Sequence, residues 1–198
     1  LGTLLIRAKE AYSPQFQQSI QAFESTLTLM GSWIRFEKTR FSWQRQKVSL
    51  TGEVRNGLNL ALGPWIKFDL KSGPISLDKI REKFPKMPAV RGRASLDITA
   101  EGHARGPAVQ GQIKAWDLEI AQQKLRSVVA DFELDNNSLH LQRVTVVTPE
   151  GHTMEGHGWI FRDKDQRILL RLSGVPPALE SLSPWLAGGD SFQATALG

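Results

Sequence analysis

The chain has 198 residues, of which 40% are hydrophobic and 23% charged, and its net charge is +5. These values fit one folded domain or two small ones, and basic residues interspersed with acidic ones argue against a nucleic-acid-binding protein, which needs a concentrated basic face. The lack of cysteine excludes disulfides, thiolate catalysis and cysteine-bound metals, and the lack of any run of 18 apolar residues excludes a membrane-spanning helix.

The first predicted element is a short helix over Ser13–Phe23. Ser13 is a typical helix N-cap, and Pro14 suits the first helical position. Apolar residues follow at i, i+4 and i+7, which places them on one helical face: Phe16, Ile20 and Phe23. The next stretch, "STLTLMG" (Ser25–Gly31), alternates apolar and polar residues and predicts a strand.

The middle of the chain predicts strands followed by a second short helix. "SLTG" (Ser49–Gly52) and "FDLKSG" (Phe68–Gly73) have strand patterns, and Pro74 interrupts the chain after them. The segment Ser76–Phe84 then repeats the helical spacing of the first helix, with apolar residues at Leu77, Ile80 and Phe84.

From about residue 88 to residue 174 the sequence predicts a meander of short antiparallel strands. Apolar residues occupy every second position, and Asp or Glu occupies many positions between them, as expected for strands with one buried face. "DNNS" (Asp135–Ser138) is the clearest hairpin signal, because Asn tolerates positive φ. A third short helix is predicted over Pro177–Leu186, with a break at Pro184.

These elements recur in the same order, which predicts a repeating unit. A strand ending in Gly, then Pro, a short helix and an alternating strand occur twice, and "SLDITAEG" (Ser95–Gly102) matches "SFQATALG" (Ser191–Gly198). We therefore expect residues 1–31 to end one repeat, residues 32–87 and 88–190 to form two more, and residues 191–198 to begin another. On this pattern we expect the chain to be a piece of a longer protein.

The pair Trp-Ile occurs three times shortly after a glycine, in Gly31–Phe36, Gly63–Phe68 and Gly156–Phe161. One interpretation makes these tryptophans a sugar-stacking or membrane-interface set. The other, which we favour, treats Trp and Ile as strand formers placed at a sheet rim.

Nothing in the sequence predicts an enzyme. His152 and His157 lie near Glu150 and Glu155, but a strand would place the two histidines on opposite faces, and their spacing fits no metal-ligand motif. The chain also lacks a nucleophile elbow, a phosphate-binding glycine loop and a dinucleotide fingerprint. We expect no catalytic residues, no metal and no cofactor.

Four consecutive stretches resemble the AsmA-like family of bacterial envelope proteins, which includes TamB and YhdP. They are "GRASLDITAEG" (Gly92–Gly102), "PAVQGQIKAWDLEI" (Pro107–Ile120), "VVADFELDNNSLHLQRVTVV" (Val128–Val147) and "GHTMEGHGWI" (Gly151–Ile160). The resemblance extends over roughly residues 49–198 and consists of strand pattern and order, without an invariant catalytic motif.

This resemblance implies a curved antiparallel sheet whose repeats form an elongated apolar groove, with two or three short helices. It implies a protein of the Gram-negative periplasm, anchored in the inner membrane through parts of the parent chain outside this sequence. It also implies transfer of phospholipid toward the outer membrane, with a further role in outer-membrane protein assembly.

The alternation itself also favours such a groove, because a sheet with one apolar face must close, pair with another sheet or hold a ligand. An open groove and the closed core of a sandwich or barrel both remain open at this point. The predicted lining is the apolar member of each strand: Leu96, Ile98, Ile113, Leu118, Ile120, Val128, Phe132, Leu134, Leu139, Leu141, Val144, Val146, Ile168, Leu170 and Leu172.

Three functions follow as hypotheses. The first is a lipid-conducting segment whose partners are phospholipid acyl chains. The second is a structural or chaperone-like module that pairs an edge strand with an outer-membrane protein or another client β-strand. The third is a carbohydrate-binding domain that uses the tryptophans. The positive charge is also compatible with a weak attraction to anionic lipid headgroups.

Overall fold

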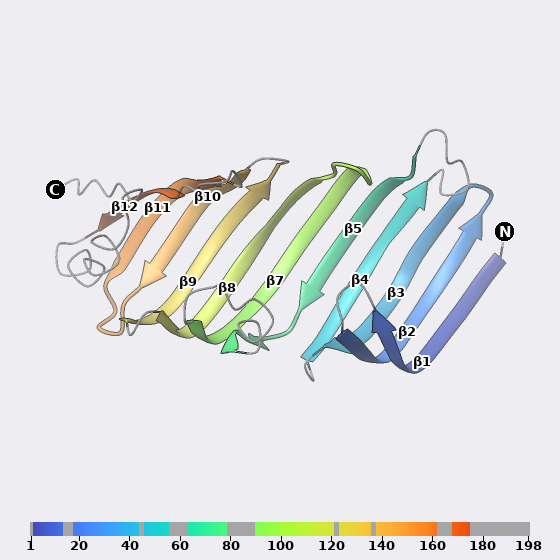
Figure 1. The fold of residues 1–198 in the computed structure, drawn as a ribbon, viewed down its shortest axis with the longest axis horizontal. Coiled ribbons are helices and arrows are strands. Elements are labelled where there is room, and N and C mark those ends of the chain that lie inside the picture. The colour runs from blue at the N-terminus through green and yellow to red at the C-terminus, as the bar shows by residue number, and fades with distance from the viewer. Residues whose placement is uncertain are drawn as a thin grey trace. The chain divides into compact units, whose positions relative to one another are not determined.

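The computed structural model describes residues 2–13, 18–43, 46–55, 63–78, 90–120, 123–135, 138–161 and 168–174, and its elements in these ranges are strands (Figure 1). The strands form one antiparallel 12-stranded sheet that is not closed. Their bounds are β1 (Gly2–Ser13), β2 (Gln18–Met30), β3 (Trp33–Trp43), β4 (Gln46–Arg55), β5 (Trp65–Ser72), β6 (Ile75–Ser76), β7 (Val90–His103), β8 (Ala108–Ile120), β9 (Gln123–Leu134), β10 (Ser138–Val147), β11 (Thr153–Phe161) and β12 (Ile168–Gly174).

Strands that follow one another in the chain are neighbours in the sheet. The order is β1-β2-β3-β4-β5-β7-β8-β9-β10-β11-β12, and the two-residue strand β6 pairs with β7 beside this path. The predicted antiparallel meander is therefore confirmed. A barrel closed by pairing of its first and last strands is not formed by the described strands.

The chain divides into two compact units. The first comprises Leu1–Ile75 and Leu96–Val109, and the second comprises Ser76–Ser95 and Gln110–Gly198. The predicted division into repeats at residues 31, 87 and 190 stays a prediction, and residues 191–198 lie outside the described part of the chain.

The predicted helix over Ser13–Phe23 is wrong where the structure describes it. Strand β1 continues to Ser13 and strand β2 begins at Gln18, while residues 14–17 lie outside the described residues. The other two predicted helices lie mostly or wholly outside the described residues, although Ser76 belongs to β6. A bulge in β2 accounts for the error: Ala22 has a φ of 50°, and the pairing with β3 shifts between Gln21 and Glu24.

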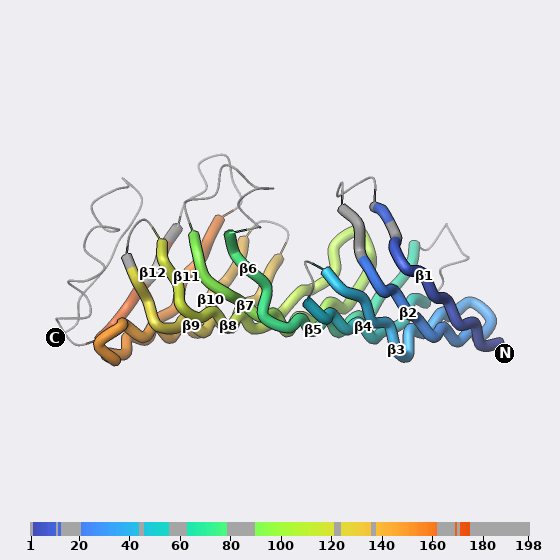
Figure 2. The backbone as a smooth tube through the Cα atoms, turned by 90° about the horizontal axis from the view of Figure 1, so that it is seen from below, coloured from blue at the N-terminus to red at the C-terminus, as the bar shows by residue number. Residues whose placement is uncertain are grey.

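Bulges also change the alternation inside other strands. In β8, Asp117 has a φ of 52°, so that Ala115 and Leu118 are both buried although they are three positions apart in the sequence. In β10 the register with β11 shifts between Leu141 and Val144. Bulges bend strands, and Figure 2 shows that the strands bend along their length.

The two units contain one three-strand arrangement in common. In the first unit, β3 has a register shift between Phe36 and Thr39, and Gly52 lies opposite Phe36. In the second unit, β10 has the shift after Leu141, and Gly158 lies opposite Leu141. The strands β3–β4–β5 therefore correspond to β10–β11–β12 in register. Ser49–Gly52 ("SLTG") lies in β4 and Thr153–Gly156 ("TMEG") lies in β11. Alignment of these two stretches matches Gly52 with Gly156, two residues away from Gly158, which the register matches with Gly52.

Candidate functional site

The strands of the first unit separate apolar from charged side chains. One row of residues in register runs across β1 to β5 and consists of Leu4, Leu27, Phe36, Gly52 and Phe68. The next row on that side is Ile6, Ser25, Thr39, Leu50, Leu70 and Ile98. We call this side the apolar face of the first unit, and the opposite side the polar face.

A glycine allows two aromatic rings to meet on the apolar face. Phe36 and Phe68 flank Gly52 in register, and their ring centroids lie 5.7 Å apart in an edge-on arrangement. A Cβ on Gly52 would lie 2.6 Å from the Phe68 Cδ1 atom, so only glycine leaves room for this contact. Aromatic pairs of this geometry stabilise a structure beyond their buried area.

The apolar face of the first unit contains one buried polar pair. The Ser25 Oγ and Thr39 Oγ1 atoms lie 2.6 Å apart and share a hydrogen bond, and the residues are only 1% and 3% exposed. One hydroxyl donates to the other, so each of the two buried oxygens has a hydrogen-bond partner.

Part of this apolar face is open to solvent. Leu4 is 48% exposed, Ile6 38% and Leu29 42%, whereas Val48 and Ile75 are buried. The aromatic residues Phe36 and Phe68 are half-buried. The first unit therefore presents accessible apolar side chains.

The second unit has a more fully buried apolar face. Its cluster consists of Ala94, Ala115, Leu118, Leu125, Ala130, Val144, Val146, Met154 and Leu172, all of them buried. Gly156 lies between Val144 and Leu172 in register, and a Cβ there would lie 2.6 Å from a Leu172 methyl carbon. These side chains are therefore packed as in the hydrophobic core of a domain.

The structure places the predicted lining residues as follows. Buried are Leu118, Phe132, Val144, Val146 and Leu172. Half-buried are Leu96, Ile98, Ile113, Ile120, Val128, Leu134, Leu139 and Leu141. The side chains of Ile168 and Leu170 lie outside the described residues, although their backbones pair with Ile160 and Gly158.

Most of these residues belong to the second unit. Register places Val128 opposite Val146, and Phe132 opposite Leu141, on one side of the sheet. Ile113, Val128 and Leu141 pack against the buried cluster. Leu96 and Ile98 belong to the first unit, where Ile98 lies opposite Leu70.

The sequence-based prediction missed the apolar face of the first unit. The missed residues are Leu4, Ile6, Leu27, Leu29, Ile34, Phe36, Val48, Leu50, Val54, Ile66, Phe68 and Leu70. Leu27 and Leu29 carried a usable alternation signal. In β3 and β5 the signal was obscured, because Trp33 and Ile34, and likewise Trp65 and Ile66, are adjacent large residues on opposite faces.

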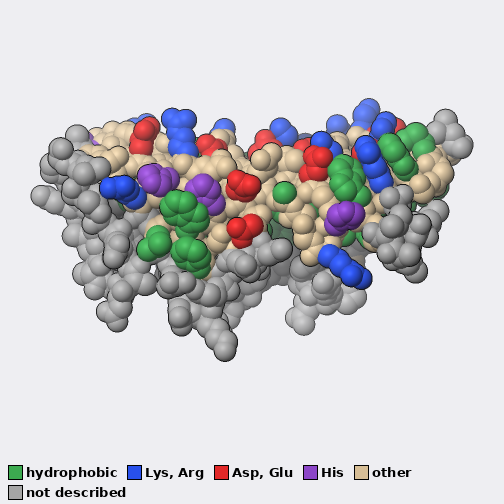
Figure 3. Space-filling view, turned by 90° about the horizontal axis from the view of Figure 1, so that it is seen from above, with side chains coloured by type: hydrophobic (Ala, Val, Ile, Leu, Met, Phe, Trp, Pro, Cys, Tyr) green, Lys and Arg blue, Asp and Glu red, His purple; other side chains and the backbone are tan. Residues whose placement is uncertain are grey.

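The polar face carries cross-strand ion pairs. In the first unit, Arg7 pairs with Glu24 at 2.8 Å, Lys67 with Glu101 at 2.8 Å, and Lys71 with Asp97 at 3.0 Å. In the second unit Arg93 pairs with Asp117. Figure 3 shows Lys and Arg side chains interspersed with Asp and Glu along this side. Exposed pairs contribute little stability individually, but they keep this face hydrated.

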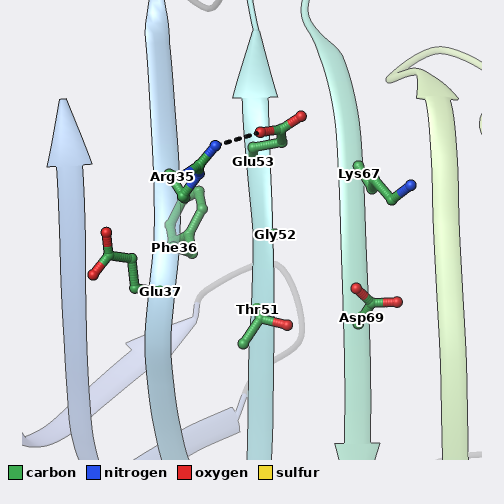
Figure 4. Close-up of a pocket in the computed structure, with 8 residues that line it drawn as sticks. All are labelled: Arg35, Phe36, Glu37, Thr51, Gly52, Glu53, Lys67 and Asp69. Carbon is green, nitrogen blue, oxygen red and sulfur yellow. Dashed lines mark ion pairs between the residues drawn. The ribbon is translucent and has the colours of Figure 1, made fainter. Parts of the chain in front are cut away.

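A hollow of about 470 Å³ lies on the polar face of the first unit, between β3, β4 and β5 (Figure 4). Arg35 reaches Glu53 at 3.7 Å across it. Its acidic groups have other partners too, since Thr28 donates to Glu37 at 2.7 Å and Thr99 donates to Asp69 at 2.9 Å. We therefore assign no ligand to this hollow.

Two ionisable groups on exposed sites have shifted pKa values. The hydrogen bond and the negative charge of Glu101 raise the pKa of Lys67. The pKa of Glu150 is lowered, mainly because its carboxylate accepts a hydrogen bond from its own backbone N–H, with a further contribution from the Thr148 hydroxyl. Neither group has the buried cleft that a catalytic acid or base needs.

The tryptophans of the three Trp-Ile pairs lie in strands. Trp33 and Trp65 flank Arg55 in register, and the Arg55 guanidinium carbon lies 4.1 Å and 4.7 Å from their ring centroids. Arg55 also donates to Glu53 at 2.8 Å. Trp159 stacks on His140 at 4.6 Å between ring centroids. One face of each ring is thus occupied by a neighbouring side chain.

The histidines do not form a metal centre in the described part of the chain. There, no three His, Asp or Glu side chains come close enough together to hold a metal ion. His157 lies in β11, while His152 lies in the preceding turn, where its N–H donates to the Thr148 Oγ1 at 3.3 Å.

Comparison with protein-family models, curated proteins and solved structures finds no match for this chain. Among the residues that the structure describes, no helix is long and apolar enough to cross a membrane.

Proposed function

We propose that the chain is a segment of a lipid-transfer protein of the AsmA-like kind, which shields phospholipid acyl chains along the apolar face of its sheet. The observation that carries this proposal is the open antiparallel sheet whose apolar side chains gather on one face and whose ion pairs gather on the other. The parent protein would lie in the periplasm of a Gram-negative bacterium, anchored in the inner membrane.

The energetics favour an apolar surface as the carrier. Exposing the chains of a diacyl lipid with about 30 methylenes to water would cost on the order of 25 kcal/mol of free energy, at about 0.8 kcal/mol per methylene. A continuous apolar surface offsets much of this cost through contact alone, so no catalytic group, metal or cofactor is required.

The first unit is the favoured contact region, because its apolar face is accessible. Leu4, Ile6 and Leu29 are each more than a third exposed on that face. In the second unit the corresponding cluster is buried, with Met154 at 0% exposure. We expect acyl chains to contact β1 and β2 before they contact the cluster of the second unit.

Photo-crosslinking to phospholipid tests this proposal. A photoreactive phenylalanine at Ile6 or Leu29 should crosslink to phospholipid, identified by mass spectrometry. The matched control is Leu5, which is 50% exposed but lies on the polar face of the same strand, opposite Thr26. Equal crosslinking at Leu5 and Ile6, or none at either, would contradict the proposal.

Charge substitution gives a second test with the same control. Ile6→Asp should reduce co-purified phospholipid severalfold, because the carboxylate must be desolvated beneath an acyl chain. Leu5→Asp should leave it unchanged, since that side chain already faces water and charged neighbours. Circular dichroism should show that both variants fold.

Strand pairing is a second candidate function, favoured by strand β1. Within the described residues β1 pairs only with β2, and it exposes Leu4, Leu5 and Ile6 on both of its faces. An edge strand with exposed apolar residues can pair with a client strand, such as one from an outer-membrane protein. A crosslinker at Thr3 that captures a β-strand of an outer-membrane protein, without lipid at Ile6, would favour this candidate.

A further inference from the structure

A basic pocket lies on the polar face of the first unit, where β3 ends, β4 begins and β5 ends. Its volume is about 690 Å³, and its lining includes three cations and, on the same face, two of its three serines: Arg40, Lys47, Lys71, Ser42 and Ser49. The structure thus gathers three positive charges from three consecutive strands.

The strand register explains the shape of this pocket. Arg40 lies opposite Ser49, Ser49 lies opposite Lys71, and Ser42 lies opposite Lys47. All five residues therefore project from the polar face, on which Lys71 meets Asp97. Ser49, whose side chain is short, thus lies between the longer cationic side chains of Arg40 and Lys71.

The pocket retains uncompensated positive charge. Lys71 is paired with Asp97, at 3.0 Å between Nζ and Oδ2. Glu24, which lies opposite Arg40 in register, is paired with Arg7 at 2.8 Å. Within the ranges that the structure describes, Arg40 and Lys47 form no ion pair. Two of the three cations are therefore available to a ligand.

We propose that this pocket binds an oxyanion of the phosphate class, through Arg40 and Lys47 with the hydroxyls of Ser42 and Ser49. The planar guanidinium of Arg40 matches two phosphate oxygens, Lys47 supplies a point charge, and the serine hydroxyls donate hydrogen bonds. The volume accommodates a group larger than inorganic phosphate. Arg40 and Lys47 are exposed, so the affinity falls with ionic strength.

Isothermal titration calorimetry with inorganic pyrophosphate at low salt tests the pocket directly. The wild-type chain should bind pyrophosphate, and the double variant Arg40→Gln/Lys47→Gln should bind it about tenfold more weakly. Asp97→Asn should strengthen binding, because it releases Lys71 from its ion pair. These side chains are exposed, so circular dichroism should show unchanged folding.

The matched control is Lys114→Gln, which removes one exposed positive charge from β8 in the second unit. It should change pyrophosphate affinity by less than twofold. A loss with Lys114→Gln equal to that of the double variant would indicate attraction to net charge alone and would overturn the proposal. Undiminished binding by the double variant, or no binding by the wild type, would overturn it too.

Vesicle binding distinguishes the two possible sources of such an oxyanion, a lipid headgroup and a soluble phosphate compound. One arm compares sedimentation with phosphatidylcholine vesicles and with vesicles that also contain phosphatidylglycerol. Binding to phosphatidylglycerol vesicles that pyrophosphate competes away, and that Arg40→Gln/Lys47→Gln abolishes, supports the pocket with a lipid headgroup as its ligand. Pyrophosphate binding without vesicle binding supports the pocket with a soluble phosphate compound as its ligand. Vesicle binding that the double variant retains contradicts the proposal.

Discussion

At position 52 a side chain of any size would collide with the neighbouring strand. A Cβ there would lie 2.1 Å from the carbonyl oxygen of Lys67 and 2.6 Å from the Phe68 Cδ1 atom. The collision partner includes backbone, which cannot move without disturbing the pairing of β4 with β5. The glycine is therefore required by close contact between strands.

Gly52→Ala should destabilise the first unit by about 1–3 kcal/mol, the range for overpacking a core. Urea unfolding followed by tryptophan fluorescence measures the change. The control is Gly2→Ala, where nothing lies within 4 Å of the added Cβ. Equal stability of the two variants would show that the Phe36–Phe68 contact adapts to the extra methyl.

The buried Ser25–Thr39 pair allows a double-mutant cycle. Ser25→Ala should cost about 1–3 kcal/mol, because it leaves the Thr39 hydroxyl buried without its partner. The double variant Ser25→Ala/Thr39→Val should cost less than the sum of the single variants, since no unpaired hydroxyl remains. Strict additivity of the free energies of unfolding would show that the hydroxyls do not interact.

At the scale of single strands, bulges determine which apolar residues share a face. In β10, Leu139 and Leu141 precede the bulge and Val144 and Val146 follow it, yet all four lie on the apolar side in register with β9. The sequence showed this change from odd to even positions, and the extra residue in the strand is its cause. Both parts of β10, before and after the bulge, could therefore be predicted as strand from the alternation of their apolar residues.

Removing one bulge residue should disrupt the second unit. Deletion of Arg143 would shift the alternation by one residue and turn either Leu139 and Leu141 or Val144 and Val146 toward the polar side. We expect a loss of several kcal/mol, measured by urea unfolding. Arg143→Ala keeps the residue count and should change stability by less than about 0.5 kcal/mol.

The same feature explains why the helix prediction over Ser13–Phe23 is wrong. A strand with an extra residue places apolar residues three apart, a spacing that also marks one face of a helix. Ile20 and Phe23 have this spacing on either side of Ala22, whose φ is 50°. Periodicity alone cannot separate these two possibilities in a short segment, and Ser13 and Pro14 reinforced the helical interpretation.

At the scale of the molecule, the antiparallel class and the alternating faces follow from the sequence, but accessibility does not. Val144, which the alternation singled out, is buried in the second unit, and Met154, which it did not single out, is buried in the same cluster. The alternation did not indicate that Leu4 and Ile6 in the first unit are exposed. Exposure depends on what covers a face, and a periodic pattern carries no information about covering.

This difference predicts contrasting responses to charge on the apolar faces. Phe132 is 7% exposed, so Phe132→Asp should lower the stability of the second unit by more than about 3 kcal/mol. Val129→Asp is the control, because Val129 lies opposite Thr145 on the other side of β9. A folded Phe132→Asp variant would show that this face tolerates solvent and behaves as a groove.

The strand order has a mechanical consequence. Because each strand pairs with its successor along nearly the whole chain, tension between the two ends would open each hairpin from one end. Backbone hydrogen bonds would then break in succession instead of all at once, so the sheet should peel at low force in many small steps. Optical-tweezers traces should show extension released strand by strand, and a protein of this design would yield to tension gradually.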